Sequence, residues 1–356
     1  MPQQIKKDTI RVRPGEELDA GRLEGFLRSH LGEILPDGNL QVRQFSAGHS
    51  NLTYELKLDD WEAVLRRPPL GPVAPKAHDM EREYRILSEI ESYFPPAPKP
   101  ILFSKDQSIV GSPFFLMERK LGIVLDSEFP AQIEATKEEG RKLSTIMVER
   151  LVELHEIDYQ ITGLNEMTKP DGFMVRQVKG WNGRYLRAQT DDIKEADFLM
   201  AWLEKNIPDQ QAATVIHYDF KLNNAMFNDD LTEMIGLFDW EMTTVGDPLA
   251  DLGVAMSYWI QNDDPDLLKF GLGKPPVTIH PGFMNRREFI EEYGRRSGRD
   301  VGSMNFYLTF AYFKLAVICQ QIYYRYKKGQ TNDPRFSGFN QFVESLIKLG
   351  CSSAKE

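Results

Sequence analysis

Several features that mark other classes of protein are scarce in this 356-residue chain. Its two cysteines, Cys319 and Cys351, lie far apart and form no CxxC motif, so we expect reduced thiols and neither a disulfide framework nor a thiolate metal site. No segment approaches the roughly 18 consecutive apolar residues of a membrane span. The opening MPQQIKKDTI lacks the apolar run of a secretory signal. These absences favour a cytoplasmic location.

An excess of positive charge is also missing, because 53 acidic residues outnumber 43 Lys and Arg residues and give a net charge of −10. General nucleic-acid binders are usually basic, so we expect no nucleic-acid partner. The lack of a long apolar run leads us to expect no membrane partner either. The negative total does not exclude an anionic ligand, since local groups govern a site. The length fits about two domains, or one domain with two lobes.

Alternating apolar residues characterise the first third of the chain. In LTYELKL, four apolar side chains share one face, as expected for a half-buried strand: Leu52, Tyr54, Leu56 and Leu58. We predict four more strands at LQVRQF, WEAVLRR, ILFS and SPFFLMERKL. Helical spacing predicts one helix inserted at 76–93 and a short leading helix from about Leu18 to Ile34.

Helical patterns dominate beyond Gly122, including 137–156, DPLADLGVAMSYW and the aromatic stretch 303–328. Strands followed by helices are typical of an α+β protein with two lobes. We therefore divide the chain into an N-terminal extension at 1–39, a strand-rich lobe at 40–120 and a helical lobe at 121–356.

The segment HYDFKLNN, residues 217–224, places several polar side chains within an apolar surrounding. The carboxylate of Asp219 can accept a proton from a hydroxyl, and the amide oxygen of Asn224 can ligate a hard cation such as Mg²⁺. Asp239 follows an apolar strand, where a lone buried carboxylate would be costly without a metal. A base and two metal ligands are parts of a phosphoryl-transfer site.

Such a site also needs a cation for the phosphates, and the strand WEAVLRR offers one. If Leu65 packs in the core of the strand-rich lobe, Arg66 and Arg67 face opposite ways and Arg66 faces the site. A predicted helix that contains Glu83 follows this strand.

Other polar residues have structural interpretations beside functional ones. Asp247 precedes Pro248, a helix N-cap pattern, and both Asp247 and Asp251 are interpreted as scaffolding in preference to extra metal ligands. His217 is expected to hold the backbone of the loop. Glu241 could approach the metal, although its closeness in sequence to Asp239 is the sole indication.

The segment VRQVKGWNGRYLRA, residues 175–188, has two interpretations. It is either a solvated helix face with two anchoring aromatic residues or an acceptor-side surface for an anionic substrate. The residues concerned are Arg176, Lys179, Arg184 and Arg187, with Trp181 and Tyr185.

The chain resembles the aminoglycoside-phosphotransferase family of kinase-like enzymes. The resemblance lies in an HxDxxxxN motif, followed by an Asp after an apolar strand and then by GDPLADLG. Within this family the chain is similar to the branch that includes kinase domains fused to some acyl-CoA dehydrogenases. The segments that carry this similarity are HYDFKLNNAMF, DWEMTTVGDPLADLG, VLRRPP and EREYRIL. The resemblance implies a bilobal protein-kinase-like α+β fold. Its N-lobe, at 40–120, would be a five-stranded antiparallel sheet with one helix that binds nucleotide. Its mostly helical C-lobe, at 121–356, would carry catalysis and substrate binding.

The resemblance also implies roles for the residues of the proposed centre. Asp219 would be the catalytic base, and Asn224 and Asp239 would hold Mg²⁺. Glu83 would pair with the phosphate-binding cation, here Arg66.

Further roles implied by the resemblance concern the nucleotide. Ser50 and Asn51, in SAGHSN, would belong to the loop over the phosphates, although that loop is poorer in glycine than a kinase GxGxxG. Backbone groups of Glu118 and Lys120, in MERKL, would meet the adenine. One departure is that most kinase-like proteins have Lys where this chain has Arg66.

We therefore expect an ATP- and Mg²⁺-dependent phosphotransferase acting on a hydroxyl of a small molecule. The branch implies hydroxyacyl-CoA or hydroxy-acid acceptors, while an aminoglycoside or choline-like acceptor remains an alternative. A nucleotide-binding pseudoenzyme is the rival from another class, and Arg66 is its only support. A protein kinase is a weaker third interpretation, because the region after Asp239 leaves little room for an activation loop.

Overall fold

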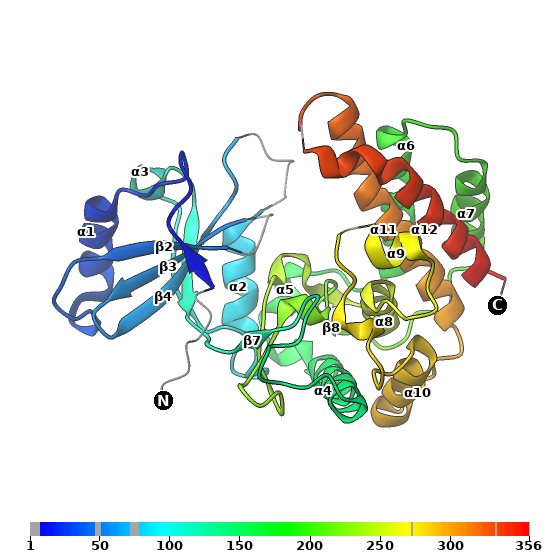
Figure 1. Ribbon diagram of the computed structural model, residues 1–356, viewed down its shortest axis with the longest axis horizontal. Coiled ribbons are helices and arrows are strands. Elements are labelled where there is room, and N and C mark those ends of the chain that lie inside the picture. The colour runs from blue at the N-terminus through cyan, green and yellow to red at the C-terminus, as the bar shows by residue number, and fades with distance from the viewer. Residues whose placement is uncertain (1–7, 47–50, 72–77, 272, 332, 356) are drawn as a thin grey trace. The chain divides into compact units, whose positions relative to one another are not determined.

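The computed structural model describes residues 8–46, 51–71, 78–271, 273–331 and 333–355 (Figure 1). The chain divides into two compact units. The first comprises Met1–Leu121 together with Gly236–Glu241, and the second comprises Gly122–Ile235 together with Met242–Glu356. A short segment far along the sequence, which contains Asp239, therefore belongs to the strand-rich unit.

An antiparallel sheet with strand order β1-β2-β3-β4-β6-β5 forms the centre of the first unit. Its strands are β1 (Thr9–Ile10), β2 (Gln41–Phe45), β3 (Leu52–Leu58), β4 (Trp61–Arg67), β5 (Pro100–Ser104) and β6 (Phe114–Glu118). The five strands predicted from the sequence are present. The additional edge strand β1 is two residues long, too short for any periodicity to reveal it.

Helix α1 (Ala20–Leu31) covers one face of this sheet, and the short α3 (Gln107–Val110) lies near it. Tyr54, Leu56 and Leu58 of β3 are fully buried, as their period of two predicted. They form one apolar cluster with Leu23 and Leu27 of α1. Burial of this apolar face is what fixes the register of the sheet, because a slip by one residue would expose it.

Helix α2 (Met80–Ile90) covers the opposite face. The helix begins at Asp79, whose side chain accepts a hydrogen bond from the backbone N–H of Arg82. The ring of Tyr84 contacts Phe115 of β6 at a centroid distance of 6.3 Å. Leu65 lies in the cluster on the α1 side of the sheet, so Arg66, the next residue of β4, points to the α2 side.

The second unit is mainly helical. Its helices are α4 (Lys137–His155), α5 (Leu164–Met167), α6 (Phe173–Ala188), α7 (Lys194–Lys205), α8 (Pro248–Tyr258), α9 (Asp266–Phe270), α10 (Arg286–Ser297), α11 (Met304–Lys327) and α12 (Phe339–Ser353). The long α11, orange in Figure 1, packs against α6, α8 and α12. Most of its side chains are therefore buried, which explains its run of aromatic residues.

Short strands complete the structure. β7 (Ile123–Val124), β9 (Ala225–Phe227) and β10 (Met234–Leu237) form a sheet of order β10-β9-β7, and β8 (Thr214–Ile216) pairs with β11 (Thr244–Gly246). Cys319 and Cys351 are buried and free of disulfide bonds. None of the described helices is both long and apolar enough to cross a membrane.

Candidate active site

A cluster of charged side chains surrounds Arg66 in the first unit. Arg66 comes from β4, Glu83 from α2 and Asp239 from the segment after β10. The guanidinium Nε of Arg66 lies 3.1 Å from Oε2 of Glu83, and its Nη2 donates to Oδ1 of Asp239. Arg66 is 8% exposed and Glu83 2% exposed, so water screens these charges poorly. The predicted pairing of Arg66 with Glu83 is therefore present.

The segment that carries Asp239 is anchored in the first unit by its neighbours. The buried indole of Trp240 donates through Nε1 to the carbonyl of Leu237, at 2.7 Å, and its ring packs on Phe94. Asp239 itself has a φ of 72°, in the left-handed region. Such a backbone conformation costs on the order of 1–3 kcal/mol and persists where the surroundings enforce it.

Burial and the neighbouring charges shift the pKa values of the ionisable groups in this cluster. Burial raises the pKa of Glu83 to about 7 even though Arg66 opposes the shift. Burial by itself would lower the pKa of Arg66, but the charges of Glu83 and Asp239 more than offset this and raise it. Burial and the charge of Asp239 also raise the pKa of Glu241. The charge of Arg66 thus stabilises three neighbouring carboxylates, those of Glu83, Asp239 and Glu241.

Asn51 extends this cluster and lies where a phosphate loop was predicted. Its Nδ2 donates to Oε2 of Glu241 at 3.3 Å, and its Oδ1 lies 2.8 Å from Nδ1 of His78. Arg82 donates from Nη1 to the backbone carbonyl of Glu241. Ser50, the other residue predicted for this loop, lies outside the described residues. Sequence reasoning missed His78, since no motif surrounds it.

Glu118 and Lys120, predicted to meet the adenine, lie at the end of β6 and directly after it. The backbone N–H of Glu118 donates to the carbonyl of Lys99 at 2.9 Å. The ammonium of Lys120 pairs with the Glu118 carboxylate at 2.8 Å and donates to the carbonyl of Pro95. These contacts fix the segment that leads to Leu121, the last residue of this stretch of the first unit.

Asp219 and Asn224 come together in the second unit, on the loop between β8 and β9. The Nδ2 group of Asn224 donates to Oδ2 of Asp219 at 2.9 Å and to its backbone carbonyl at 3.0 Å. The 3-10 turn Leu222–Asn224 brings the amide back towards the carboxylate. Lys221 pairs with the same carboxylate at 2.9 Å. Lys221 stands within the quoted motif, yet nothing in the motif indicated this contact.

Buried hydrogen bonds fix the backbone of the loop that carries Asp219. The carboxylate of Asp251, on α8, accepts the backbone N–H groups of His217 at 2.7 Å and Tyr218 at 2.8 Å. His155 approaches the same carboxylate through Nε2 at 3.1 Å, and its Nδ1 lies 2.7 Å from the hydroxyl of Tyr293. Burial opposes the charge of Asp251, but these donors outweigh it and lower its pKa. The scaffolding interpretation of Asp251 agrees with these contacts.

Two further structural interpretations from the sequence are borne out. Asp247 is the N-cap of α8 and accepts from the backbone N–H of Leu249, and it also accepts from the hydroxyl of Tyr307. The Nδ1 of His217 lies 3.3 Å from the backbone nitrogen of Asp219, so this ring supports the loop backbone.

Tyr218, the residue before Asp219, has a φ of 66°. A bulky side chain rarely adopts this region, so the surrounding hydrogen bonds must hold the backbone there. Its carbonyl accepts from the ammonium of Lys314 at 3.0 Å, and its hydroxyl lies 3.3 Å from Oε1 of Gln177. In the second unit the strained backbone thus belongs to the residue before Asp219. In the first unit it belongs to Asp239 itself.

The basic segment of α6 has the two anchoring aromatic residues of its structural interpretation. Trp181 and Tyr185 are buried anchors. Arg176 donates to the backbone carbonyls of Lys169 and Asp171, a local structural role. Arg184 instead lies over the Trp181 ring, 4.3 Å from its centroid.

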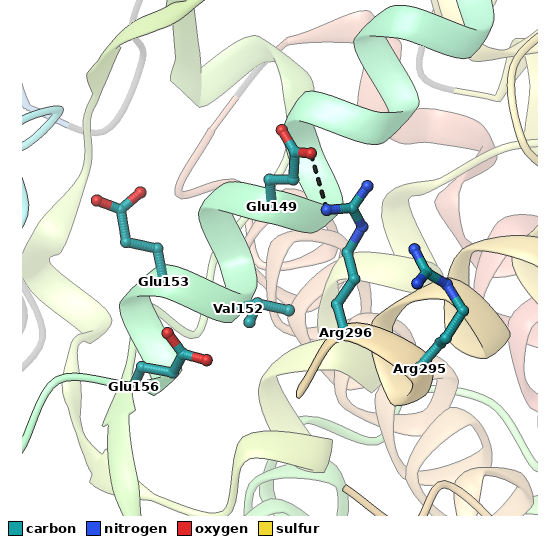
Figure 2. Close-up of a pocket in the computed structure, with 6 residues that line it drawn as sticks. All are labelled: Glu149, Val152, Glu153, Glu156, Arg295 and Arg296. Carbon is teal, nitrogen blue, oxygen red and sulfur yellow. Dashed lines mark ion pairs between the residues drawn. The ribbon is translucent and has the colours of Figure 1, made fainter. Parts of the chain in front are cut away.

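A hollow on the second unit lies elsewhere, between α4 and α10 (Figure 2). It is lined by Glu149, Val152, Glu153, Glu156, Arg295 and Arg296. Arg296 pairs with Glu149 at 2.8 Å, and Arg295 pairs with Glu292 at 2.6 Å. None of the residues predicted to take part in phosphoryl transfer lines this hollow, and its arginines are already matched by carboxylates.

Comparison with known proteins identifies the family. The model of the phosphotransferase enzyme family matches residues 41–304, which is most of the chain. The chain therefore belongs to this family. Acyl-CoA dehydrogenase family member 10 of Mus musculus is 32% identical over 344 residues, which cover 96% of this chain and 32% of that protein. The chain thus spans about a third of the length of this relative. The predicted resemblance to this branch is confirmed.

Solved structures agree on the fold. A crystal structure from Ralstonia eutropha, of a protein named as a candidate aminoglycoside phosphotransferase, is 28% identical, with a TM-score of 0.79 over 95% of this chain and 99% of that chain. The spectinomycin phosphotransferase in complex with ADP and spectinomycin is 12% identical, with a TM-score of 0.60 over 97% and 100%. The second likeness shows the fold alone. The predicted kinase-like fold, with a strand-rich lobe and a helical lobe, is confirmed.

Proposed function

We propose that this protein is an ATP- and Mg²⁺-dependent phosphotransferase that phosphorylates a hydroxyl group of a small molecule. The observation that carries the proposal is the pairing of Asp219 with Asn224 at 2.9 Å, on a loop held by buried hydrogen bonds. Membership of the phosphotransferase family supports the same reaction class.

The chemistry of the available donors fits Mg²⁺. Asn224 engages Asp219 through its amide nitrogen, which leaves the amide oxygen as the atom for a metal. Asp239 supplies a carboxylate, and hard oxygen donors of these two kinds suit Mg²⁺. In this proposal Asn224 and Asp239 hold the ion. When bound, Mg²⁺ would offset the negative charge that develops on the phosphate during transfer.

The residues of this chain would then divide the remaining work. Asp219 would accept the proton of the acceptor hydroxyl and orient its oxygen for attack. Arg66 would neutralise the α and β phosphates while Glu83 fixes its guanidinium, as their 3.1 Å contact allows. Asn51, with Ser50, would belong to the loop over the phosphates.

The adenine would be met by the backbone near Glu118 and Lys120. In this proposal, residues 40–120 bind the nucleotide, residues 121–356 carry the catalytic loop and the acceptor site, and residues 1–39 are an extension.

The acceptor is proposed to be anionic, in the class of hydroxyacyl-CoA or hydroxy acids. Arg184 stacks on Trp181, and its charge acts on Lys314, which contacts the catalytic loop. Lys221 lies at Asp219 itself. Such a concentration of cations favours an anion over a polycationic aminoglycoside or choline-like compound. The names of the curated relatives, which refer to acyl-CoA dehydrogenases, support the same acceptor class.

An acceptor screen tests this function. With ATP and Mg²⁺, we expect ADP release to depend on a hydroxyacyl-CoA or hydroxy acid, with aminoglycosides and choline inactive, in a coupled assay with product identification by mass spectrometry. CoA esters at millimolar concentration should also shift the melting temperature. If ATP raises the melting temperature but no acceptor is phosphorylated, the pseudoenzyme alternative holds. Phosphorylation of an aminoglycoside alone would overturn the acceptor class.

Removing the positive charges of α6 should weaken the acceptor specifically. We expect Arg184→Gln with Arg187→Gln to raise KM for an anionic acceptor by about 10- to 100-fold, since a hydrogen bond to a charged group contributes about 1.5–3 kcal/mol. KM for ATP should stay unchanged. Arg176→Gln, on the same helix but bonded to local backbone carbonyls, is the matched control. Equal effects on both substrates would contradict an acceptor role for this surface.

A further inference from the structure

A lone lysine lies within the apolar core of the second unit, against the loop that carries Asp219. Lys314 belongs to the aromatic helix α11 and is 3% exposed. Among the described residues, no carboxylate lies within ion-pair distance of its ammonium. A buried charge without an ion pair is costly and is retained where it serves a purpose. The sequence predicted only that Lys314 lies on a helix of the core, and it indicated no role for this residue.

The ammonium of Lys314 is directed at Tyr218. It donates to the Tyr218 carbonyl at 3.0 Å and lies 3.8 Å from the centroid of the Tyr218 ring. The Trp181 ring centroid is 5.9 Å away on another side. Aromatic faces partly compensate a desolvated cation, which explains how the charge is tolerated.

The peptide group that Lys314 contacts joins Tyr218 to Asp219. Its carbonyl end accepts from Lys314, and its N–H end lies 3.3 Å from Nδ1 of His217. A planar peptide bonded at both ends resists rotation. Tyr218 is held at a φ of 66°, so this peptide would relax if either bond were lost.

We propose that Lys314 is a positioning residue for phosphoryl transfer, whose bond to the Tyr218 carbonyl fixes the peptide that aims the Asp219 carboxylate. The inference rests on the proposed function, since it assigns Lys314 a task through the proposed base. Lys314 itself touches neither the acceptor nor the metal in this scheme.

The protonation of Lys314 gives the proposal a signature in pH. Burial lowers the pKa of Lys314 to about 8, with Asp219 and Asp251 opposing the shift and Lys221 and Arg184 adding to it. The hydroxyl of Tyr218 titrates well above this range, because burial raises its pKa. A charge-assisted hydrogen bond is roughly twice as strong as a neutral one. The bond from Lys314 to the Tyr218 carbonyl therefore weakens as pH rises through about 8 and the ammonium loses its proton. Wild-type kcat should fall over the same interval.

Substitution separates positioning from a structural role. We expect Lys314→Met to lower kcat by about 10- to 100-fold at pH 7, in line with the loss of one charge-assisted bond, with KM for ATP within about twofold. The melting temperature should change little, because relief of the buried charge offsets the lost bond. A lysine that merely stabilised the fold would lower the melting temperature when removed and leave kcat of the folded enzyme unchanged, and that result would overturn the proposal.

Lys314→Arg tests the charge without removing it. This variant should keep most of the activity and should shift the fall in kcat to higher pH, because guanidinium stays protonated. An alkaline limb at the wild-type position would show that the limb belongs to another group and would refute the assignment. Thr309→Val is the control, since Thr309 is a buried polar residue of the same helix that bonds the Gly350 carbonyl of α12, away from the loop.

Hydrogen exchange provides a readout that needs no turnover. In the full-length protein, amides of the segment 216–220 should exchange about tenfold faster in Lys314→Met than in the wild type. Lys314→Arg and Thr309→Val should retain wild-type protection. Unchanged exchange in Lys314→Met would overturn the proposal even in an active enzyme. An inactive wild type with this exchange pattern would instead remove the proposed function and leave the positioning contact established.

Discussion

Replacing Asp219 with asparagine is expected to lower kcat by about 10²- to 10⁴-fold, the range that a positioned general base contributes. Asparagine has the same shape and its oxygen can still accept from Asn224, so the loop should keep its conformation. The amide cannot take a proton from the acceptor hydroxyl. Single-turnover kinetics with ATP, Mg²⁺ and the acceptor found in the screen would measure the loss.

The same variant should leave binding and stability nearly intact. We expect the nucleotide-induced shift in melting temperature to persist, because the phosphate-binding residues are untouched. Asp266→Asn is the control, since its exposed carboxylate pairs with Lys269 on a surface helix and the same chemical change there should leave kcat unaffected. Near-wild-type phosphoryl transfer by Asp219→Asn would refute the assignment of Asp219 as base.

The neighbouring amides offer a comparison for the metal. Asn224 contacts the Asp219 carboxylate, whereas Asn223 is directed at Asp126. If Asn224 is a metal ligand, alanine at 224 should raise the Mg²⁺ concentration required for activity, and alanine at 223 should leave it unchanged.

The strands were predictable because burial repeats every two residues and needs no knowledge of the partner. The same period correctly separated Arg66 from Arg67 on opposite faces of β4. Arg66 meets carboxylates, whereas Arg67 donates to the Tyr54 hydroxyl and to backbone carbonyls. Motif spacing also predicted that Asp219 and Asn224 would lie together.

Contacts between distant segments were not predictable in this way. Nothing local indicates that His78 meets Asn51, or that the segment after β10 packs in the first unit through Trp240. The contact of Lys314 with the Tyr218 carbonyl could not be predicted either. The apolar period of α11 indicates which side chains face the core, but not which carbonyl group a buried lysine meets. These features depend on tertiary packing, and a single sequence carries no direct signal of such pairs.

Arg66 should be the residue whose removal most damages the first unit. Arg66→Met would remove the charge that acts on Glu83, Asp239 and Glu241, and removing one partner of a buried ion pair costs about 3–5 kcal/mol. Nucleotide binding should be lost as well. Denaturant unfolding and a thermal-shift series with ATP and Mg²⁺ would measure both effects. Arg67→Met is the matched control: it should lower stability less, because no carboxylate is orphaned, and should retain nucleotide binding.

The pH dependence of Arg66→Met follows from the orphaned carboxylates. Burial already raises the pKa of Glu83 to about 7 in the wild type, and loss of the Arg66 charge, which opposes that shift, raises it further. A carboxyl whose pKa is higher in the folded than in the unfolded state stabilises the fold at low pH and loses this contribution as pH rises. The deficit of Arg66→Met relative to the wild type should therefore grow as pH rises above about 7, where Glu83 ionises in the wild type but stays protonated in the variant.

A second substitution distinguishes stability from function at this cluster. Arg66→Met combined with Glu83→Leu replaces a buried ion pair with apolar side chains, a change that is often neutral or stabilising. We expect the double variant to recover much of the stability lost in Arg66→Met while nucleotide binding stays absent, because the guanidinium proposed to hold the phosphates is gone. Wild-type affinity for ATP in the double variant would contradict the role of Arg66, since the fold would then be intact without the group proposed to hold the phosphates.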